Sequence, residues 1–442
     1  MKNIALPFHP LYARKKKAGP PPRQTIVNRD ARKKEGDSAN PFQRGTSRGA
    51  KMVMDLKDYI PDTQIIARQN VTAKGAWPVA IDYGYSSVKG FSPNKAFKYP
   101  NCAAKVKDDT MIGEPKKSDI TLRDASGTWV VGEQAAALLA DSGSINYEED
   151  LFGRNRYFSP VFKAIIEAGI ALGLKRNGVG GPGAGTRVSL QTGLPPRFRE
   201  ADSAVLRAAL SGNYSFDMRA GFTPYEHYEF TIRPEDISIM DQPMGSLISC
   251  VTGTDGNTVR SQVGLLREKT LVFDPGFKTL DIFNIAAGII EGTPQTYDNL
   301  GMLEVFTRAA EDIRKQYGTV LTVPQLQFAI RRGSVSVGDW RLGQTHDVPL
   351  DNIMEKTCRS VCMDAVSKMM ASYDGLQNHD NLVITGGTGS VWLPIIADYF
   401  KNMRSIHIIS ANRNDQSLPN VFSNARGYYY FAVNRLRKEA KG

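Results

Sequence analysis

Residues 79–90 read Val-Ala-Ile-Asp-Tyr-Gly-Tyr-Ser-Ser-Val-Lys-Gly, and residues 271–282 read Leu-Val-Phe-Asp-Pro-Gly-Phe-Lys-Thr-Leu-Asp-Ile. Each stretch is a short apolar run that ends in an Asp-x-Gly turn. The run is typical of a buried strand, which would bring the carboxylate of Asp82 or Asp274 to the strand's end. The glycine lets the backbone turn tightly, so that N–H groups can face an anion. Two copies of one template favour a shared site for a polyphosphate.

The side chains around the two turns suit such an anion. Ser86, Ser87 and Thr279 offer hydroxyl donors, and Lys89 offers a cation. A charge-assisted hydrogen bond of this kind is worth roughly 1.5–3 kcal/mol. With one hairpin in each domain, the loops would hold the polyphosphate from both sides. The two aspartates would hold Mg²⁺ through water, because magnesium keeps much of its hydration shell.

A third glycine-rich element lies late in the chain. Residues 381–390 read Asn-Leu-Val-Ile-Thr-Gly-Gly-Thr-Gly-Ser, which predicts a strand that ends at a Gly-Gly turn before an apolar segment starting at Val391. Without side chains, the glycines let a flat ring lie against the backbone, and a helix N-terminus favours negative charge. The glycine spacing is GGxG, which differs from the GxGxxG of dinucleotide loops.

In this order, the DxGxxxxK, DxGxxTxD and TGG patterns resemble the phosphate-1, phosphate-2 and adenosine loops of the actin, DnaK-type chaperone and sugar-kinase superfamily. Within it, the sequence is most similar to prokaryotic actin-like proteins of the ParM/StbA plasmid-segregation type and their archaeal relatives. Further matches lie at 129–135, 192–195 and 424–429. The resemblance covers roughly residues 77–440. It implies an α/β fold with two similar domains on either side of a nucleotide cleft.

The resemblance also implies roles for individual residues. Asp82 and Asp274 are the expected metal-side carboxylates. The residues expected around the β- and γ-phosphates are Gly84, Tyr85, Ser86, Ser87, Lys89, Gly276, Phe277, Lys278 and Thr279. The residues expected near the adenosine are Gly386, Gly387 and Thr388, and those expected to approach the ribose are Glu311 and Lys315.

The water-orienting residue of the family follows the strand before the second phosphate loop. Gln242 takes that position by spacing, and Asp241 is the alternative. ParM-type proteins resemble one another in carrying Glu there, whereas actins carry Gln. Because Gln is a poor proton acceptor, we expect slow hydrolysis until assembly closes the site. Pro275 departs from the family pattern, since it removes one backbone donor from the second loop.

The charge of the chain is concentrated at its N-terminus. The 442 residues carry a formal charge of +11, and residues 1–51 hold thirteen Lys or Arg but only three acids. We therefore expect a basic, mostly disordered arm over residues 1–75, followed by a nearly neutral body. The body is expected to divide into domain I (76–262), with the first phosphate loop, and domain II (263–442), with the other two loops. The last helix is expected to pack back on domain I.

Apolar runs and helical periodicity predict alternating strands and helices, as α/β proteins show. The expected strands cover 77–81, 129–131, 187–191, 237–240, 271–273, 382–384 and 406–409. The expected helices cover 161–174, 201–210, 303–317, 353–373 and 423–438, with a short helix near 54–59. Residues 178–185 read Gly-Val-Gly-Gly-Pro-Gly-Ala-Gly and are interpreted as a flexible connector. No apolar stretch of about 18 residues predicts a membrane span.

The leading hypothesis is a cytoplasmic, Mg²⁺-dependent ATPase that polymerises into cytomotive filaments for plasmid or other DNA segregation, with GTP as the alternative nucleotide. Its expected partners are its own copies and an adaptor protein on the DNA. A second hypothesis is an ATP-regulated DNA-binding protein that uses the basic arm. A third is a small-molecule kinase of the same fold, which needs a carboxylate base, and Asp241 is the candidate.

Overall fold

The computed structural model describes residue 56 and residues 59–60, 62–107, 114–142, 154–176, 181–182, 185–339 and 343–441. The basic segment 1–51 lies outside the described residues, as do most of the short helix expected at 54–59 and most of the connector expected at 178–185. Within the described part, no helix is long and apolar enough to cross a membrane.

The first large sheet has six strands in the order β1-β4-β3-β2-β8-β11. Their bounds are β1 Gln64–Ala67, β2 Trp77–Tyr83, β3 Ser87–Ser92, β4 Lys95–Pro100, β8 Val188–Leu194 and β11 Ile237–Asp241. Strands β2 and β3 form an antiparallel hairpin, whereas β8 runs parallel to both β2 and β11. The carboxyl ends of β2, β8 and β11 therefore lie at one edge of the sheet.

A second large sheet repeats this pattern, in the order β14-β13-β12-β18-β19 with β15 against β13. Its strands are β12 Thr270–Pro275, β13 Thr279–Ala286, β14 Ile289–Ile290, β15 Gln295–Asp298, β18 Asn381–Ile384 and β19 His407–Ser410. Here β12 and β13 form the hairpin, and β18 is parallel to β12 and β19. In the sequence, the strands of the first sheet precede the predicted domain boundary near residue 262 and those of the second sheet follow it. The boundary itself stays a prediction.

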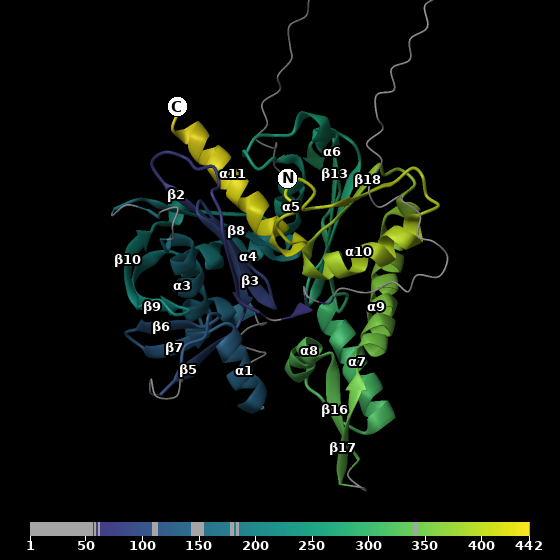
Figure 1. The fold of residues 1–442 in the computed structure, drawn as a ribbon. Coiled ribbons are helices and arrows are strands. Elements are labelled where there is room, and N and C mark those ends of the chain that lie inside the picture. The colour runs from purple at the N-terminus through teal and green to yellow at the C-terminus, as the bar shows by residue number, and fades with distance from the viewer. Residues whose placement is uncertain are drawn as a thin grey trace, which may run out of the picture. The chain divides into compact units, whose positions relative to one another are not determined.

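Two smaller sheets complete the described strands. One is antiparallel and contains β5 Ala103–Val106, β6 Ile120–Asp124, β7 Gly127–Val131, β9 Gly212–Ala220 and β10 Glu226–Ile232. The other is the ribbon β16 Ser334–Asp339 and β17 Gln344–Pro349, which extends beyond α7 and α8 in Figure 1.

The longer helices are α1 Glu133–Ser142, α3 Pro160–Leu174, α4 Pro196–Leu210, α5 Gln242–Val251, α7 Met302–Tyr317, α8 Val323–Arg332, α9 Asp351–Ser372, α10 Gly386–Phe400 and α11 Ser423–Glu439. A short helix, α6, covers Gly264–Arg267. Local signals explain several ends. The Ser159 hydroxyl caps α3 ahead of Pro160, and Thr322 with Gln325 forms a capping box on α8.

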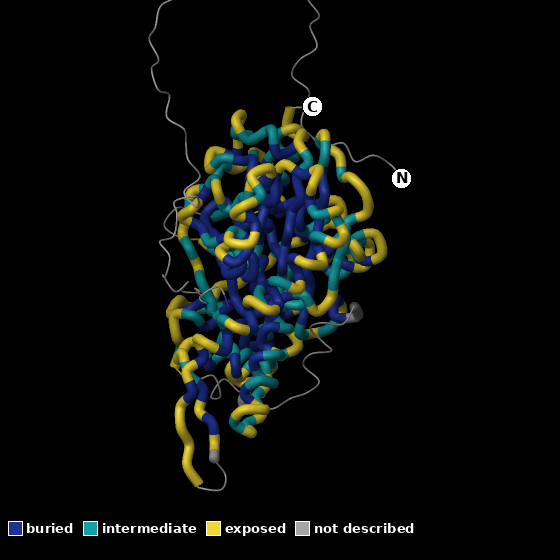
Figure 2. The backbone as a smooth tube through the Cα atoms, turned by 90° about the vertical axis from the view of Figure 1, so that its right-hand side faces the viewer, coloured by how far each residue is buried: buried dark blue, intermediate teal, exposed yellow. Residues whose placement is uncertain are grey.

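The first large sheet is covered on both faces, which buries its central strands. Val79 and Ile81 of β2 face Gly173 and Gly169 of α3, whereas Gly193 of β8 faces α11. Figure 2 shows the buried interior as a continuous dark region. Because successive side chains of a strand point to opposite faces, the register that places Ile81 beside Thr192 also directs Asp82 toward α11.

The helix α11 comes last in the chain but lies against the first large sheet. It packs against α5, β2 and β8, all from residues before 262, and it crosses the centre of Figure 1 in yellow. Gly427 makes this packing close, because a Cβ atom there would lie 1.7 Å from the carbonyl oxygen of Gly245 on α5. The last helix therefore contacts the first half of the body.

The N-terminal boundary of the body differs from the prediction. We expected a mostly disordered arm up to residue 75, but β1 pairs antiparallel with β4 over Gln64–Ala67. The Asp62 carboxylate also forms an ion pair with Lys98 Nζ at 2.8 Å. The prediction was wrong for residues 62–75 because β1 is a four-residue edge strand whose partners lie elsewhere in the chain.

Candidate functional site

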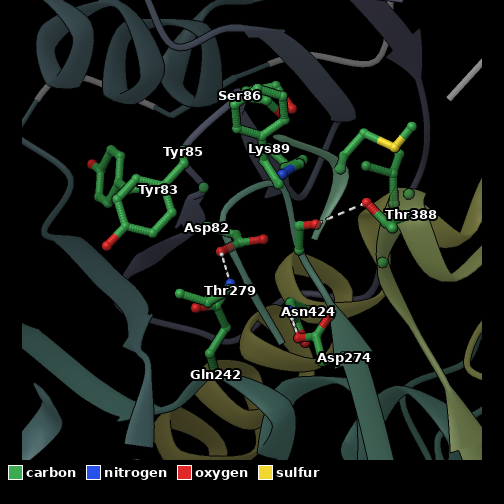
Figure 3. Close-up of a pocket in the computed structure, with 18 of the residues that line it drawn as sticks. Asp82, Tyr83, Tyr85, Ser86, Lys89, Gln242, Asp274, Thr279, Thr388 and Asn424 are labelled. Carbon is green, nitrogen blue, oxygen red and sulfur yellow. Dashed lines mark hydrogen bonds between the residues drawn. The ribbon is translucent and has the colours of Figure 1, made fainter. Parts of the chain in front are cut away.

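The two Asp-x-Gly turns meet at one pocket. Its lining includes Asp82 near the end of β2 and Asp274 near the end of β12, and the empty space measures about 1160 Å³, including space open to solvent. The side chains of both aspartates are buried, with exposures of 3% and 5%. Figure 3 labels both carboxylates among the residues that line the pocket.

Burial changes the protonation of both carboxyls. It raises the pKa of Asp82, and the nearby Lys89 ammonium opposes that shift. It raises the pKa of Asp274 to about 6, against a hydrogen bond from Asn424 that lowers it. A buried carboxylate that lacks a full counter-charge favours a bound cation. Among the described residues, no three Asp, Glu, His or Cys side chains gather closely enough to hold a metal ion by themselves.

Lys89 supplies the positive charge of the first hairpin. It lies directly opposite Asp82 in the β2–β3 register, and its Nζ reaches the turn, where a Cβ on Gly84 would lie 2.6 Å from it. Burial lowers the pKa of this ammonium, whereas Asp82 and Asp274 raise it. The lysine therefore lies between the two carboxylates and the backbone that would face an anion.

The second hairpin carries a different partner. Asp281 stands opposite Asp274 in the β12–β13 register, lines the same pocket and accepts a hydrogen bond from Thr296 Oγ1 at 2.6 Å. Burial raises the pKa of Asp281 to about 8. One hairpin thus pairs an aspartate with a lysine, and the other pairs two aspartates.

The second turn is fixed by its neighbours. The amide of Gly276 donates to the Thr279 carbonyl at 2.7 Å, and the Gly276 carbonyl accepts from Met302 N at 3.1 Å and from Thr388 Oγ1 at 2.9 Å. The Phe277 carbonyl accepts from Leu303 N at 2.7 Å. The start of α7 and the glycine loop at 386–388 therefore hold this turn from two directions.

The third glycine element also reaches the pocket. Gly386, Gly387 and Thr388 line it, and they form the first turn of α10, which begins earlier than the apolar segment at Val391 suggested. Gly386 has φ +77°, and a Cβ there would lie 2.9 Å from Asp274 Oδ1. Glycine is required here because an L side chain would be strained and would press on the carboxylate.

The geometry distinguishes Gln242 from Asp241. Gln242 begins α5, lines the pocket and donates through Nε2 to Asp82 Oδ1 at 3.2 Å. Asp241 instead pairs with Arg199 Nε on α4 at 3.0 Å and is not part of the lining. The glutamine, rather than the aspartate, faces the space between the two turns.

Most of the remaining predicted residues also line the pocket, namely Gly84, Tyr85, Ser86, Ser87, Gly276, Phe277 and Thr279. Lys278 lies beside it, with Nζ 5.7 Å from the centre of the Tyr85 ring. The ring of Tyr85 also lies 4.8 Å from Arg156 Cζ, a buried lining residue that the sequence did not indicate.

The structure does not bring Glu311 and Lys315 to this pocket. They line a separate groove between α7 and α9, where Glu311 pairs with Arg314 at 2.7 Å and with Lys315 at 3.4 Å. The reason is distance along the helix. Only Met302 of α7 lines the pocket, and nine residues at about 1.5 Å each separate it from Glu311.

Sequence reasoning missed several residues that complete the site. Asp281 belongs to the DxGxxTxD pattern, and Asn424 belongs to the matching segment 424–429, but the sequence analysis assigned neither residue a role. Tyr59, Ile60 and Asp62 line the pocket from the N-terminal side, inside the segment expected to be disordered. A carboxylate two residues after Thr279, on the same strand face, was a usable signal for Asp281.

Comparison with known proteins agrees with this geometry. Residues 80–245 match the family model described as the N-terminal domain of actin-like proteins. No curated protein matches the sequence.

Solved structures are similar over most of the chain. A 15-stranded ParM filament from Clostridium botulinum is 18% identical with a TM-score of 0.62, and the match covers 81% of this chain and 99% of that one. The archaeal actin homolog Ta0583 is 16% identical with a TM-score of 0.57, again over 81% and 99%. The Alp12 filament is 16% identical with a TM-score of 0.53, over 82% and 99%.

Identities this low establish the fold and nothing finer. The match of 80–245, the repeated sheet pattern and the paired turns agree with one another, so the chain has an actin-like fold, and residues 80–245 are similar to the N-terminal domain of actin-like proteins.

Proposed function

We propose that this chain binds a nucleoside triphosphate with Mg²⁺ in the described pocket, hydrolyses it, and couples hydrolysis to assembly of its own copies into filaments. One observation carries the proposal. Asp82 and Asp274 stand at the ends of equivalent strands in two sheets of the same pattern and line one pocket with Lys89 and Gln242. ATP is the proposed nucleotide, with GTP as the alternative.

The chain's own residues divide the work. The N–H groups of the Gly84 and Gly276 turns, the Ser86, Ser87 and Thr279 hydroxyls and Lys89 Nζ would bind the phosphates. Asp82 and Asp274 would hold the hydrated metal, which when bound neutralises phosphate charge. Gln242 would orient the attacking water, because its amide offers both a donor and an acceptor. Gly386, Gly387 and Thr388 would bound the adenosine.

The filament part of the proposal rests on the solved structures. The C. botulinum ParM and Alp12 structures are described as filaments, and each covers four-fifths of this chain. A cytoplasmic protein that segregates plasmid or other DNA through an adaptor protein is the fuller form of the proposal, and it rests on the resemblance of the sequence motifs to the ParM/StbA plasmid-segregation type. A small-molecule kinase has less support, because Asp241, its candidate base, pairs with Arg199.

A first experiment tests nucleotide-dependent assembly. Right-angle light scattering and phosphate release are followed together after Mg·ATP or Mg·GTP is added, with Asp274→Ala as the inactive variant. A nucleotide-dependent rise that the variant lacks would support the proposal. Flat scattering with normal turnover would reject assembly, and no turnover in either protein would reject the ATPase. Asn381→Ala, a buried substitution at the opposite end of the second sheet, serves as the matched control.

The basic segment favours direct DNA contact as a second candidate function. Residues 1–51 carry nearly all of the net charge, and about eight phosphate contacts would give log K a slope near −7 against log salt. Deleting residues 1–53 leaves every described residue of the body in place. Loss of DNA retention with intact assembly would assign DNA contact to this segment, whereas unchanged retention would reject it.

A further inference from the structure

A row of hydrogen-bonded, buried polar side chains extends from Asp274, starting in the lining of the pocket. Its other members are Asn424 on α11, Ser246 on α5 and Thr385, the residue before α10. Thr385 and Ser246 have no exposed surface, and Asn424 is 5% exposed. Four elements that are distant in sequence thus contribute to one hydrogen-bonded row.

The row has a direction, which follows from the chemistry of its end. Asn424 Nδ2 donates to Asp274 Oδ2 at 2.9 Å, as the dashed line in Figure 3 shows. The amide oxygen Oδ1 must then face Ser246 Oγ, which lies 2.6 Å away. Because Ser246 has a single hydroxyl proton and gives it to Asn424, the hydroxyl of Thr385 donates to Ser246. Every donor in the row therefore points toward the carboxylate.

Thr385 shows that this arrangement takes precedence over ordinary helix capping. Threonine at the start of a helix usually accepts a hydrogen bond from a backbone amide. Thr385 stands at the N-cap of α10 yet makes no side-chain cap. Its hydroxyl contacts Ser246 instead, which links α10 to α5.

The helix α5 serves both metal-side carboxylates. Gln242, its first residue, donates to Asp82, and Ser246 lies one turn later on the same face and holds Asn424. Each aspartate thus accepts one hydrogen bond from a neutral amide. An amide orients a carboxylate without neutralising it, so the negative charge remains available to a bound cation. An arginine or lysine partner would neutralise that charge.

We propose that Asn424 is a positioning residue, itself oriented by Ser246 and Thr385, that fixes the Asp274 carboxylate for the metal bound with a nucleotide. The inference rests on the proposed nucleotide site and adds a residue to it. Asn424 acts through Asp274 and is not assigned a contact with the nucleotide. Partners that orient metal ligands in this way typically change metal affinity by about 10–100-fold when removed.

Calorimetric titration with ADP, in Mg²⁺ and separately in EDTA, tests this assignment on the full chain. GDP replaces ADP if the wild-type chain binds it more tightly. We expect Asn424→Ala to lower the enhancement of affinity by Mg²⁺ by about 10–100-fold and to leave affinity in EDTA unchanged. Ser246→Ala should act in the same direction but less, because the Asn424 amide can then turn away from Asp274.

The matched control is Asn381→Ala. Asn381 is also a buried asparagine, and its Nδ2 donates to Glu268 Oε2 at 2.8 Å and Thr270 Oγ1 at 3.3 Å, at the other end of β12 and β18. We expect its Mg²⁺ enhancement to equal that of the wild type. Circular dichroism establishes folding, and if Asn424→Ala fails to fold, Ser246→Ala decides.

Three results would overturn the inference. Equal losses of affinity in Mg²⁺ and EDTA would make Asn424 a general structural residue. An unchanged Mg²⁺ enhancement in both the Asn424 and the Ser246 variants would separate the row from the metal. A wild-type chain that binds neither ADP nor GDP would reject the nucleotide site and this inference together, a result that the variants cannot imitate.

Discussion

Gln242 and Asp241 are neighbours in the chain, yet only the glutamine reaches Asp82. If Gln242 orients the attacking water, Gln242→Ala should slow phosphate release by roughly 100-fold, the order that one well-placed hydrogen-bonding group contributes. Nucleotide affinity in EDTA should change little, because the contact of Gln242 with the attacking water forms mainly in the transition state. Single-turnover phosphate release and equilibrium binding measure the two effects. Asp241→Asn is the control, and a larger loss in that variant would exchange the two roles.

Glu167 on α3 gives a pH-dependent prediction at the same scale. Its side chain is buried, and burial raises the pKa of its carboxyl from 4.5 to about 7, although Lys163 Nζ lies 3.5 Å away and opposes the shift. The folded protein therefore binds this proton more tightly than the unfolded chain does. It follows that the free energy of unfolding contributed by Glu167 falls as pH rises from about 4.5 to 7.

The Glu167→Gln side chain stays neutral at every pH, so the variant should lack this pH-dependent fall in the free energy of unfolding. Urea unfolding at several pH values should show the variant gaining stability relative to the wild type between pH 5 and pH 8. Parallel curves over that range would show that the Lys163 ammonium compensates the carboxylate fully.

The sequence could predict individual residues where a local pattern brought chemistry to a strand end. Asp82, Asp274 and Gly386 follow apolar runs, so their meeting at one pocket was predictable from strand geometry. Asn424 could not be given a role in this way, because its partners Asp274 and Ser246 come from other elements. Glu311 was placed by resemblance alone, and no local pattern tied it to the pocket.

At the scale of elements, the packing of α5 against α11 sets the positions of the two amide side chains of the site, Gln242 and Asn424. A Cβ at Gly427 would lie 1.7 Å from the Gly245 carbonyl oxygen, so Gly427→Ala must push the helices apart. Overpacking of this kind costs about 1–3 kcal/mol, and the shift should also displace Gln242 and Asn424 and weaken nucleotide binding. Urea unfolding and ADP titration measure the two effects. Ala432→Gly, on the same helix, should lower stability by about 1 kcal/mol but leave binding intact.

Element prediction succeeded where burial was continuous and was less complete elsewhere. The predicted strand at 271–273 became β12, and the predicted helix at 353–373 became α9. The strand β9 was not predicted, although its buried residues Tyr214, Phe216 and Met218 alternate with more exposed ones. That alternation is the period-two signal of a half-buried strand. The ribbon β16–β17 has a weaker signal, because most side chains of β17 are exposed.

At the scale of the whole body, two ion pairs link elements from the first half of the body to elements from the second half. Glu133, at the start of α1, pairs with Arg331 of α8 at 2.6 Å and also accepts from the Thr63 amide at 3.1 Å. Arg197 of α4 pairs with Asp298 of β15 at 3.5 Å. These pairs are partly exposed, so each should contribute about 1 kcal/mol or less to closure.

Opening of the body should therefore be sensitive to these pairs. Arg331→Glu places two carboxylates together and should speed release of a bound fluorescent nucleotide several-fold in stopped-flow measurements, because release requires the two halves to separate. Glu133→Arg combined with Arg331→Glu should bring the release rate only part of the way back to the slow wild-type rate. An arginine at position 133 cannot accept the hydrogen bond that the Thr63 amide donates to Glu133. High salt should reduce the effect of Arg331→Glu, because screening weakens partly exposed charges. Release rates that stay equal in all variants at low salt would show that the pair does not limit opening.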